Sequence, residues 1–155
     1  MPTAPKPIDL RLTRFSPQLN VKQEGNKRLV FGTIRKKWLV LQPEEFVRQL
    51  LLHFLIGDMR YNRNRITVER GVSVNTETRR TDILVFDADM RPFLLIECKA
   101  PKVKLSTGTF RQAANYNGPI KVPYLMICNG RGSYIAEIDY QAKDYRFLAS
   151  VPEWL

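Results

Sequence analysis

Histidine and cysteine are rare in this chain, and it has no long apolar segment. Its one histidine, His53, rules out a histidine-rich zinc site and gives little support to a histidine-based catalytic triad. Its two cysteines, Cys98 and Cys128, lie in apolar runs, which predicts buried free thiols rather than a disulfide framework. No run approaches ~20 apolar residues, and the N-terminus lacks the apolar core of a signal peptide. We therefore expect no membrane association and a cytoplasmic location.

Acidic residues are also few compared with basic ones. The 155 residues include 25 Lys and Arg against 15 Asp and Glu, which gives a net charge of +10. That imbalance favours an anionic partner, most often nucleic acid; the alternative is a soluble basic protein without a polyanionic partner. The length and the 44% hydrophobic content fit a single domain with a core of its own.

Composition divides the chain into two parts. Residues 1–28 are rich in proline, lysine and arginine, which predicts an extended basic arm. The domain itself is expected over residues 29–155. It opens with two short apolar runs in residues 29–40, which suit a hairpin or a strand–loop–strand unit.

Periodicity then predicts a mixed central sheet flanked by helices. Pro43 begins a helix with apolar residues at helical spacing, and Gly57 and Asp58 end it. A second helix, capped by Ser106 or Thr109, runs to about Asn117. Strands are expected at residues 66–72, 81–86, 93–99, 123–128 and 133–140, with Trp154 in an apolar tail that docks on the body. This is an α/β fold with a hairpin near residues 88–92.

Residues 81–99 carry the candidate chemistry. Glu97 and Lys99 alternate on one face of a strand, and Asp82 begins the neighbouring strand. Two carboxylates at one end of a sheet suit a hard divalent cation such as Mg²⁺ or Mn²⁺, with a lysine beside a water or phosphate. The alternative is an exposed ion pair on a strand, which is a common arrangement. Both carboxylates adjoin apolar runs, and that position favours the site.

These residues resemble the PD-(D/E)xK nuclease superfamily, and most of all the N-terminal domain of type I restriction enzyme R (HsdR) subunits. The resemblance covers residues 35–140 through the segments RKKW, PEEFVRQ, RRTDILVFD, LLIECKAP and ICNG. Thr81 stands where the superfamily name expects a proline. The resemblance implies a restriction-endonuclease-like αβββαβ core and a metal-dependent DNA endonuclease.

The resemblance also implies roles for individual residues. Asp82, Glu97 and the backbone carbonyl of Cys98 would hold the metal, and Lys99 would serve the attacking water. An acidic residue of the first helix often joins such a site, so Glu45 is the candidate and Glu44 the alternative; either one could instead only interact with the helix dipole.

A pair on the second helix resembles another part of the superfamily pattern. Gln112 and Tyr116 lie four residues apart, hence on one helix face. They resemble the QxxxY element, which lines the site and contacts DNA in some members. The alternative is a surface pair with a half-buried tyrosine.

Basic residues around the site are expected to contact phosphates, although a solvated basic face is the alternative for each. They are Arg35, Lys36, Lys37, Arg79, Arg80, Lys102 and Lys104. Glu69 is expected to be the cross-strand partner of an arginine, with no ligand role assigned. Expected partners are DNA and either a second copy of the chain or restriction or repair proteins. A non-catalytic nucleic-acid-binding module with the same fold is the rival interpretation, and a purely structural protein is a third.

Overall fold

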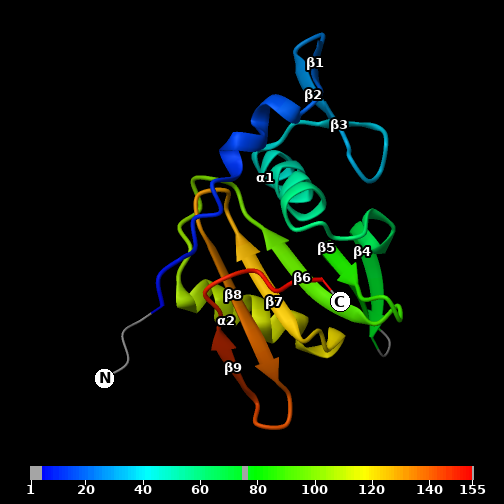
Figure 1. The fold of residues 1–155 in the computed structure, drawn as a ribbon. Helices are drawn as coiled ribbons and strands as arrows, with labels where there is room; N and C mark the ends of the chain where they lie inside the picture. The colour runs from blue at the N-terminus through cyan, green and yellow to red at the C-terminus, as the bar shows by residue number, and fades with distance from the viewer. Residues whose placement is uncertain (1–4, 75–76, 155) are drawn as a thin grey trace.

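A six-stranded sheet forms the body of the protein, with one long helix on each face (Figure 1). The computed structural model describes residues 5–74 and 77–154, and within them the side chains of residues 70 and 72–80 lie outside the description. The strands of this sheet are β4 (Ile66–Val74), β5 (Glu77–Phe86), β6 (Pro92–Cys98), β7 (Tyr124–Cys128), β8 (Ser133–Asp139) and β9 (Asp144–Phe147).

The strands lie side by side in chain order, and the sheet is mixed. All neighbours are antiparallel except β6 and β7, which pair in parallel from Leu94↔Tyr124 to Cys98↔Cys128. A parallel pair needs a crossover, and α2 (Thr107–Asn117) provides it. Together with α1 (Pro43–His53), the order α1, β4, β5, β6, α2, β7 is the expected αβββαβ core.

The two faces of the sheet bury separate cores. Ile83 and Ile96 point toward α1 and join a cluster with Leu50 and Leu51 of that helix. Side chains alternate along strands, so their neighbours Leu84 and Leu95 pack on the opposite face, against Phe110 of α2. The site therefore lies on a sheet end that is fixed from both sides.

Both predicted helices are present, and their starts have clear local causes. Pro43 occupies the first turn of α1, where its missing N–H costs nothing, with Glu44 and Glu45 beside it at the positive end of the helix dipole. A π-helical turn, η2 (Phe54–Asp58), follows and ends the helix where the sequence predicts. Ser106 caps α2, and its side chain accepts from the N–H of Thr109 at 3.2 Å. Thr109 is therefore the third helical residue and not the cap.

Residues 12–31 differ from the predicted arm. They form a 3₁₀-helix, η1 (Leu12–Gln18), and the hairpin β1 (Val21–Glu24) and β2 (Lys27–Phe31), which with β3 (Trp38–Val40) makes a second, three-stranded sheet. The expected boundary between residues 28 and 29 falls inside β2, which pairs with β1 as well as with β3. The strand–loop–strand prediction for residues 29–40 is confirmed.

The last strand, β9, is absent from the sequence prediction. It pairs with β8 from Ala136↔Phe147 to Asp139↔Asp144 at the edge of the sheet. Its exposed and partly buried residues give only a short alternation, which is a weak local signal. The tail docks as expected, and the Trp154 indole N–H donates to the Phe86 carbonyl at 2.9 Å. Among the described helices, none has the length and apolar character needed to cross a bilayer.

Candidate functional site

Asp82 lies where the pairing between β5 and β6 ends. The recorded pairs run to Ile83↔Ile96, so the same antiparallel register continued by one residue sets Asp82 against Glu97. The Asp82 carboxylate takes the place of a backbone acceptor there, because its Oδ2 accepts the Cys98 N–H at 2.8 Å. The acidic residue of β5 is thereby bound to the middle residue of the Glu97–Lys99 motif.

A buried arginine of α1 contacts Asp82 from the other side. Arg48 is only 5% exposed, and its Nη2 donates to Asp82 Oδ1 at 3.0 Å. Its Nη1 lies 2.6 Å from Glu45 Oε1 and 3.5 Å from Glu69 Oε1. One guanidinium therefore faces three carboxylates, which come from α1, β4 and β5.

Burial would by itself lower the pKa of Arg48. The carboxylates of Glu45 and Asp82 act in the opposite sense, together with the nearby Cys98 sulfur, and the net pKa is raised above its ordinary value. Arg48 is thus a permanent cation at this position.

Glu45 is the acidic helix residue that the sequence suggests for the site, and the structure gives it two partners. Its Oε1 accepts from Arg48 and its Oε2 accepts from the Gln49 amide at 2.9 Å. Gln49 in turn accepts the backbone N–H of Thr33, which fastens the β2–β3 loop to α1. The alternative, Glu44, is exposed and takes no part in this network.

Glu69 pairs with arginines, as expected. It bonds Arg35 of the β2–β3 loop and faces Arg48. Its φ of 47° lies in the left-handed region, which is uncommon for a non-glycine residue in a strand and carries a cost of ~1–3 kcal/mol. The arginines come from a loop and a helix rather than from the neighbouring strand.

Glu97 and Lys99 lie with the α2 pair in one small cavity. Lys99 Nζ is 3.1 Å from Glu97 Oε2, and both side chains are partly exposed. A cavity of about 250 Å³ is lined by Glu97, Lys99, Val103, Thr109, Gln112, Ala113 and Tyr116. The structure thus brings together four of the predicted residues, from β6 with its following loop and from α2.

The donor atoms can be compared with the needs of a divalent cation. Asp82 and Glu97 are oxygen donors of the kind that Mg²⁺ prefers, and Mg²⁺ often uses one or two carboxylates and keeps its waters. In the described part of the chain, no group of three or more acidic, histidine or cysteine side chains is gathered to hold an ion. The Glu45 carboxylate is occupied by Arg48 and Gln49. Asp82 also has both carboxylate oxygens engaged as hydrogen-bond acceptors. The chain thus offers two carboxylates of the right chemical type, Asp82 and Glu97.

Cys98 can contribute only its backbone. Its side chain is buried in the core on the α1 face, and burial raises the pKa of the thiol well above its ordinary value, with Asp82 adding to the effect. Cys128 is also a buried free thiol, so the prediction for both cysteines is confirmed.

Five of the seven basic residues predicted to bind phosphate lie on two loops. Lys36 and Lys37 are exposed on the β2–β3 loop, next to Arg35. Lys102 and Lys104 are exposed on the β6–α2 loop, on either side of the cavity residue Val103. The side chains of Arg79 and Arg80 lie outside the described residues.

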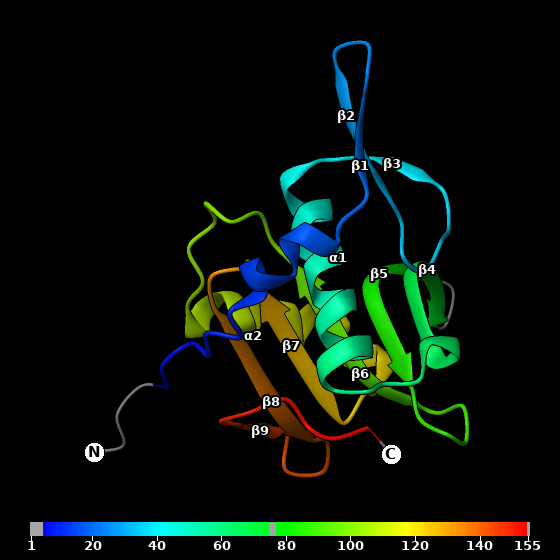
Figure 2. The ribbon, with the colours of Figure 1, turned by 45° about the horizontal axis from the view of Figure 1, so that its top comes forward.

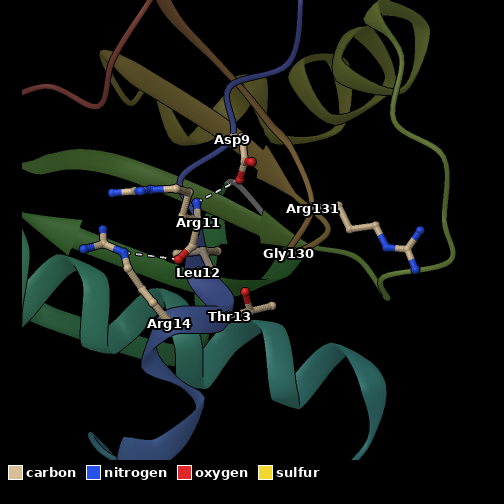
Figure 3. A pocket seen from close by; sticks show the side chains of 7 residues that line it. All are labelled: Asp9, Arg11, Leu12, Thr13, Arg14, Gly130 and Arg131. Carbon is tan, nitrogen blue, oxygen red and sulfur yellow. Dashed lines mark hydrogen bonds between the residues drawn. The ribbon is translucent and has the colours of Figure 1, made fainter.

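A second depression, of about 590 Å³, lies between the N-terminal segment and the β7–β8 loop. Three arginines line it, but Figure 3 shows the Arg11 and Arg14 side chains running one way and Arg131 the other. Arg14 is also paired with Asp58 at 2.6 Å. The guanidinium groups do not converge on one anion, and we assign no site there.

Comparison with known proteins gives the family. The model of the type I restriction enzyme R protein N terminus matches residues 43–152, which include α1, the whole central sheet and α2. The chain belongs to this R protein N-terminal family. The match contains Glu45, Arg48, Asp82, Glu97 and Lys99.

One solved structure is similar to this R protein N-terminal domain. It is a fragment described as an HsdR subunit of a type I restriction enzyme from Vibrio vulnificus YJ016, with 20% identity and a TM-score of 0.49. The match covers 72% of this chain and 24% of that one, so the chain spans about a quarter of its relative's length. No curated protein matches the chain.

The sequence did not identify Arg48 as part of the site. By its spacing Arg48 projects away from the centre of the helix's apolar stripe, whereas the folded chain buries it. The signal was present as the spacing of Glu45, Arg48 and Gln49, three polar residues on neighbouring turns of one helix. The Asp82 carboxylate that Arg48 contacts is 34 residues away in the chain and is not visible in that spacing.

Proposed function

We propose that this R protein N-terminal domain is a metal-dependent DNA endonuclease that hydrolyses phosphodiester bonds. The observation that carries the proposal is the cavity shared by Glu97, Lys99, Gln112 and Tyr116, at the sheet end where Asp82 contacts β6. Membership of a restriction enzyme family and a net charge of +10 support a phosphate backbone as the substrate.

The proposed metal ligands are Asp82, Glu97 and the Cys98 carbonyl, with Mg²⁺ or Mn²⁺ as the ion. When bound, such an ion stabilises charge on a phosphodiester and lowers the pKa of a water molecule. Arg48 orients the Asp82 carboxylate by donating to Oδ1, and the Cys98 N–H fixes its second oxygen. The part of Glu45 in the proposed reaction is to hold Arg48.

Lys99 is the residue we assign to the attacking water. Its ammonium is held by Glu97 at 3.1 Å and opens on the cavity, where it can orient water and neutralise charge that develops on the phosphate. Gln112 and Tyr116 are proposed to contact the scissile nucleotide. Lys102 and Lys104, exposed on the loop above, are proposed to hold the flanking phosphates.

A non-catalytic DNA-binding module is the second candidate. It is favoured by the same ion pairs, because Asp82 and Glu97 each already face a cation, Arg48 and Lys99. In a type I restriction system the domain would work with further subunits, or as a homodimer to cut both strands. We propose both these partners and a cytoplasmic location.

A cleavage assay separates the two candidates. Plasmid and single-stranded DNA are incubated with Mg²⁺, Mn²⁺ or EDTA and with wild type, Asp82→Ala, Asp82→Asn or Lys99→Ala. The matched controls are Asp89→Ala and Lys143→Ala, exposed residues of other turns. We expect metal-dependent cleavage that both controls retain and the site variants lose by a factor of about 100 or more.

Thermal melting of each variant checks that the fold survives. Salt-sensitive binding without cleavage by any protein would support the binding module instead. Equal cleavage by wild type and the Asp82 and Lys99 variants would show a contaminating nuclease and remove the site assignment.

A further inference from the structure

The three-stranded sheet β1–β2–β3 stands apart from the rest of the molecule. Figure 2 shows the β1–β2 hairpin projecting beyond α1, away from the central sheet. Of the described residues in these three strands, only Val30 is buried, and it belongs to neither of the two large hydrophobic clusters. All of β1 and most of β2 and β3 are exposed. Because this sheet contributes so little to the hydrophobic core, core packing does not explain why the chain forms it.

Its charge is concentrated and of one sign. Residues 21–38 contain six basic side chains and one acidic one, Glu24, so they carry +5, which is half of the net +10 of the whole chain. Glu24 is used locally, in a pair with Lys22 at 3.3 Å. Four cations are exposed and make no ion pair within the described residues: Lys27, Arg28, Lys36 and Lys37.

The hairpin is a narrow two-stranded ribbon with a tight turn. Gly25 begins its two-residue turn with a φ of 61°, as a type II′ turn requires, and Glu24 pairs directly with Lys27. A two-stranded ribbon of this kind fits the major groove of B-DNA, which is about 12 Å wide. Its basic side chains would then reach the phosphates on both sides of the groove.

The aromatic residues argue against a single-stranded ligand. Single-strand sites offer open aromatic faces on which bases stack. Here the Lys22 ammonium lies over the Trp38 ring, 4.3 Å from its centroid, and Phe31 packs edge-on against Trp38 at 5.3 Å. Trp38 and Phe31 are 36% and 37% exposed, yet Lys22 and their mutual contact occupy part of both rings, so the exposed cations are the main feature that this surface offers to a nucleic acid.

The β2–β3 loop also connects the ribbon to the candidate site. Arg35 of this loop pairs with Glu69, which faces Arg48 at 3.5 Å, and Arg48 contacts Asp82. The Gln49–Thr33 hydrogen bond holds the same loop on α1. A duplex bound to the ribbon would therefore be fixed close to the cavity rather than at a remote end.

We propose that the β1–β2–β3 sheet is a duplex-DNA-binding surface, with Lys27, Arg28, Lys36 and Lys37 on the phosphates. This inference deepens the proposed nuclease function and rests on it for the choice of nucleic acid. The proposed surface lies outside the segment that the family model matches, because the match begins at residue 43 and includes none of these three strands.

The test measures binding without cleavage. Fluorescence anisotropy of a labelled 20-bp duplex is recorded in EDTA across a range of salt, for wild type, Lys27→Ala/Arg28→Ala and Lys36→Ala/Lys37→Ala. The control Lys121→Ala/Lys143→Ala also removes two exposed charges, from the segments that precede β7 and β9.

Each sheet pair should weaken binding at least about tenfold near 100 mM salt and reduce the salt slope by about 1.8, since each phosphate contact contributes about 0.9. The control pair should change neither. Trp38→Ala should leave preference for duplex over single strand intact. Equal effects of all three pairs of substitutions would overturn the proposal. Poly-glutamate that competes for binding as strongly as unlabelled duplex would also overturn it, because that result would indicate an acidic protein partner.

The outcome can be separated from that of the nuclease proposal. Binding that depends on the sheet but is never followed by cleavage keeps this surface and rejects the enzyme. Cleavage that is unaffected by both sheet pairs keeps the enzyme and rejects this surface.

Discussion

Arg48 Nη2 lies 3.0 Å from Asp82 Oδ1, and this contact joins α1 to the sheet end that carries the candidate site. The same guanidinium holds Glu45 at 2.6 Å and is almost wholly buried. A positive charge built into the protein thus keeps the Asp82 carboxylate oriented before any ligand arrives. A divalent cation at Asp82 would meet a site whose negative charge is already partly balanced.

Arg48→Met should lower the free energy of unfolding by about 3–5 kcal/mol, because it leaves buried carboxylate charge unpaired. Urea unfolding measures the loss. Adding Glu45→Gln to Arg48→Met should recover part of it, which gives a positive coupling in a double-mutant cycle. Arg146→Met is the control: its ion pair with Glu137 is mostly exposed, so the loss should stay below about 1 kcal/mol. Equal losses of stability in Arg48→Met and Arg146→Met would contradict the conclusion that the buried contacts of Arg48 stabilise the fold more than an exposed ion pair does.

Stability should fall as the pH rises above about 9. Burial raises the pKa of Cys98 in the folded state, so the folded protein keeps a proton that the unfolded thiol releases near its ordinary pKa of 9.0. The contribution is complete below that pH and is lost above it, by up to about 1.4 kcal/mol per pH unit. Chemical denaturation at several pH values should give Cys98→Ala a shallower decline between pH 9 and 10. The same slope in wild type and Cys98→Ala would contradict this prediction, because it would show that folding does not change the pKa of the Cys98 thiol in this pH range.

Ser106→Ala should weaken the start of α2, the helix that carries Gln112 and Tyr116. The hydroxyl accepts the Thr109 N–H, and the Thr109 hydroxyl accepts the Ser106 N–H at 2.8 Å, so two helix-end donors depend on the pair. We expect a loss of about 1 kcal/mol and faster amide exchange in the first turn. Ser150→Ala, at an exposed position near the C-terminus, should leave both measurements unchanged.

Trp154→Phe should loosen the C-terminal tail by removing the hydrogen bond to the Phe86 carbonyl. The expected cost is about 1–2 kcal/mol, since a partly buried acceptor loses its donor. Tryptophan fluorescence checks it directly, because only Trp38, which is 36% exposed, then remains to emit and should be readily quenched by iodide. Trp38→Phe should leave stability nearly unchanged. A larger loss of stability in Trp38→Phe than in Trp154→Phe would contradict the conclusion that Trp154 anchors the C-terminal tail.

The central fold follows from local patterns. Apolar alternation fixes the five predicted strands, and the apolar stripe after Pro43 fixes α1, because these periods alone decide which side chains share a face. The order of helices and strands then allows few topologies, and a helix between β6 and β7 requires their parallel pairing. Asp82, Glu97 and Lys99 could be proposed as site residues from the sequence, because both carboxylates adjoin apolar runs and the three residues resemble a nuclease motif.

Tertiary structure decided what surrounds those residues. The spacing of Arg48 places it away from the centre of the apolar stripe, but in the folded protein it contacts Asp82 of β5. Glu69 has an ordinary strand position in the sequence, but in the folded protein it pairs with Arg35 and Arg48. The composition of the N-terminal segment predicts a basic arm, whereas pairing of β1 with β2 makes it a sheet. In each case the decisive partner lies in another element, so its effect depends on long-range contact and leaves no period in the sequence. The sequence determined the αβββαβ frame and its acidic residues, and the folded structure determined which cations they face.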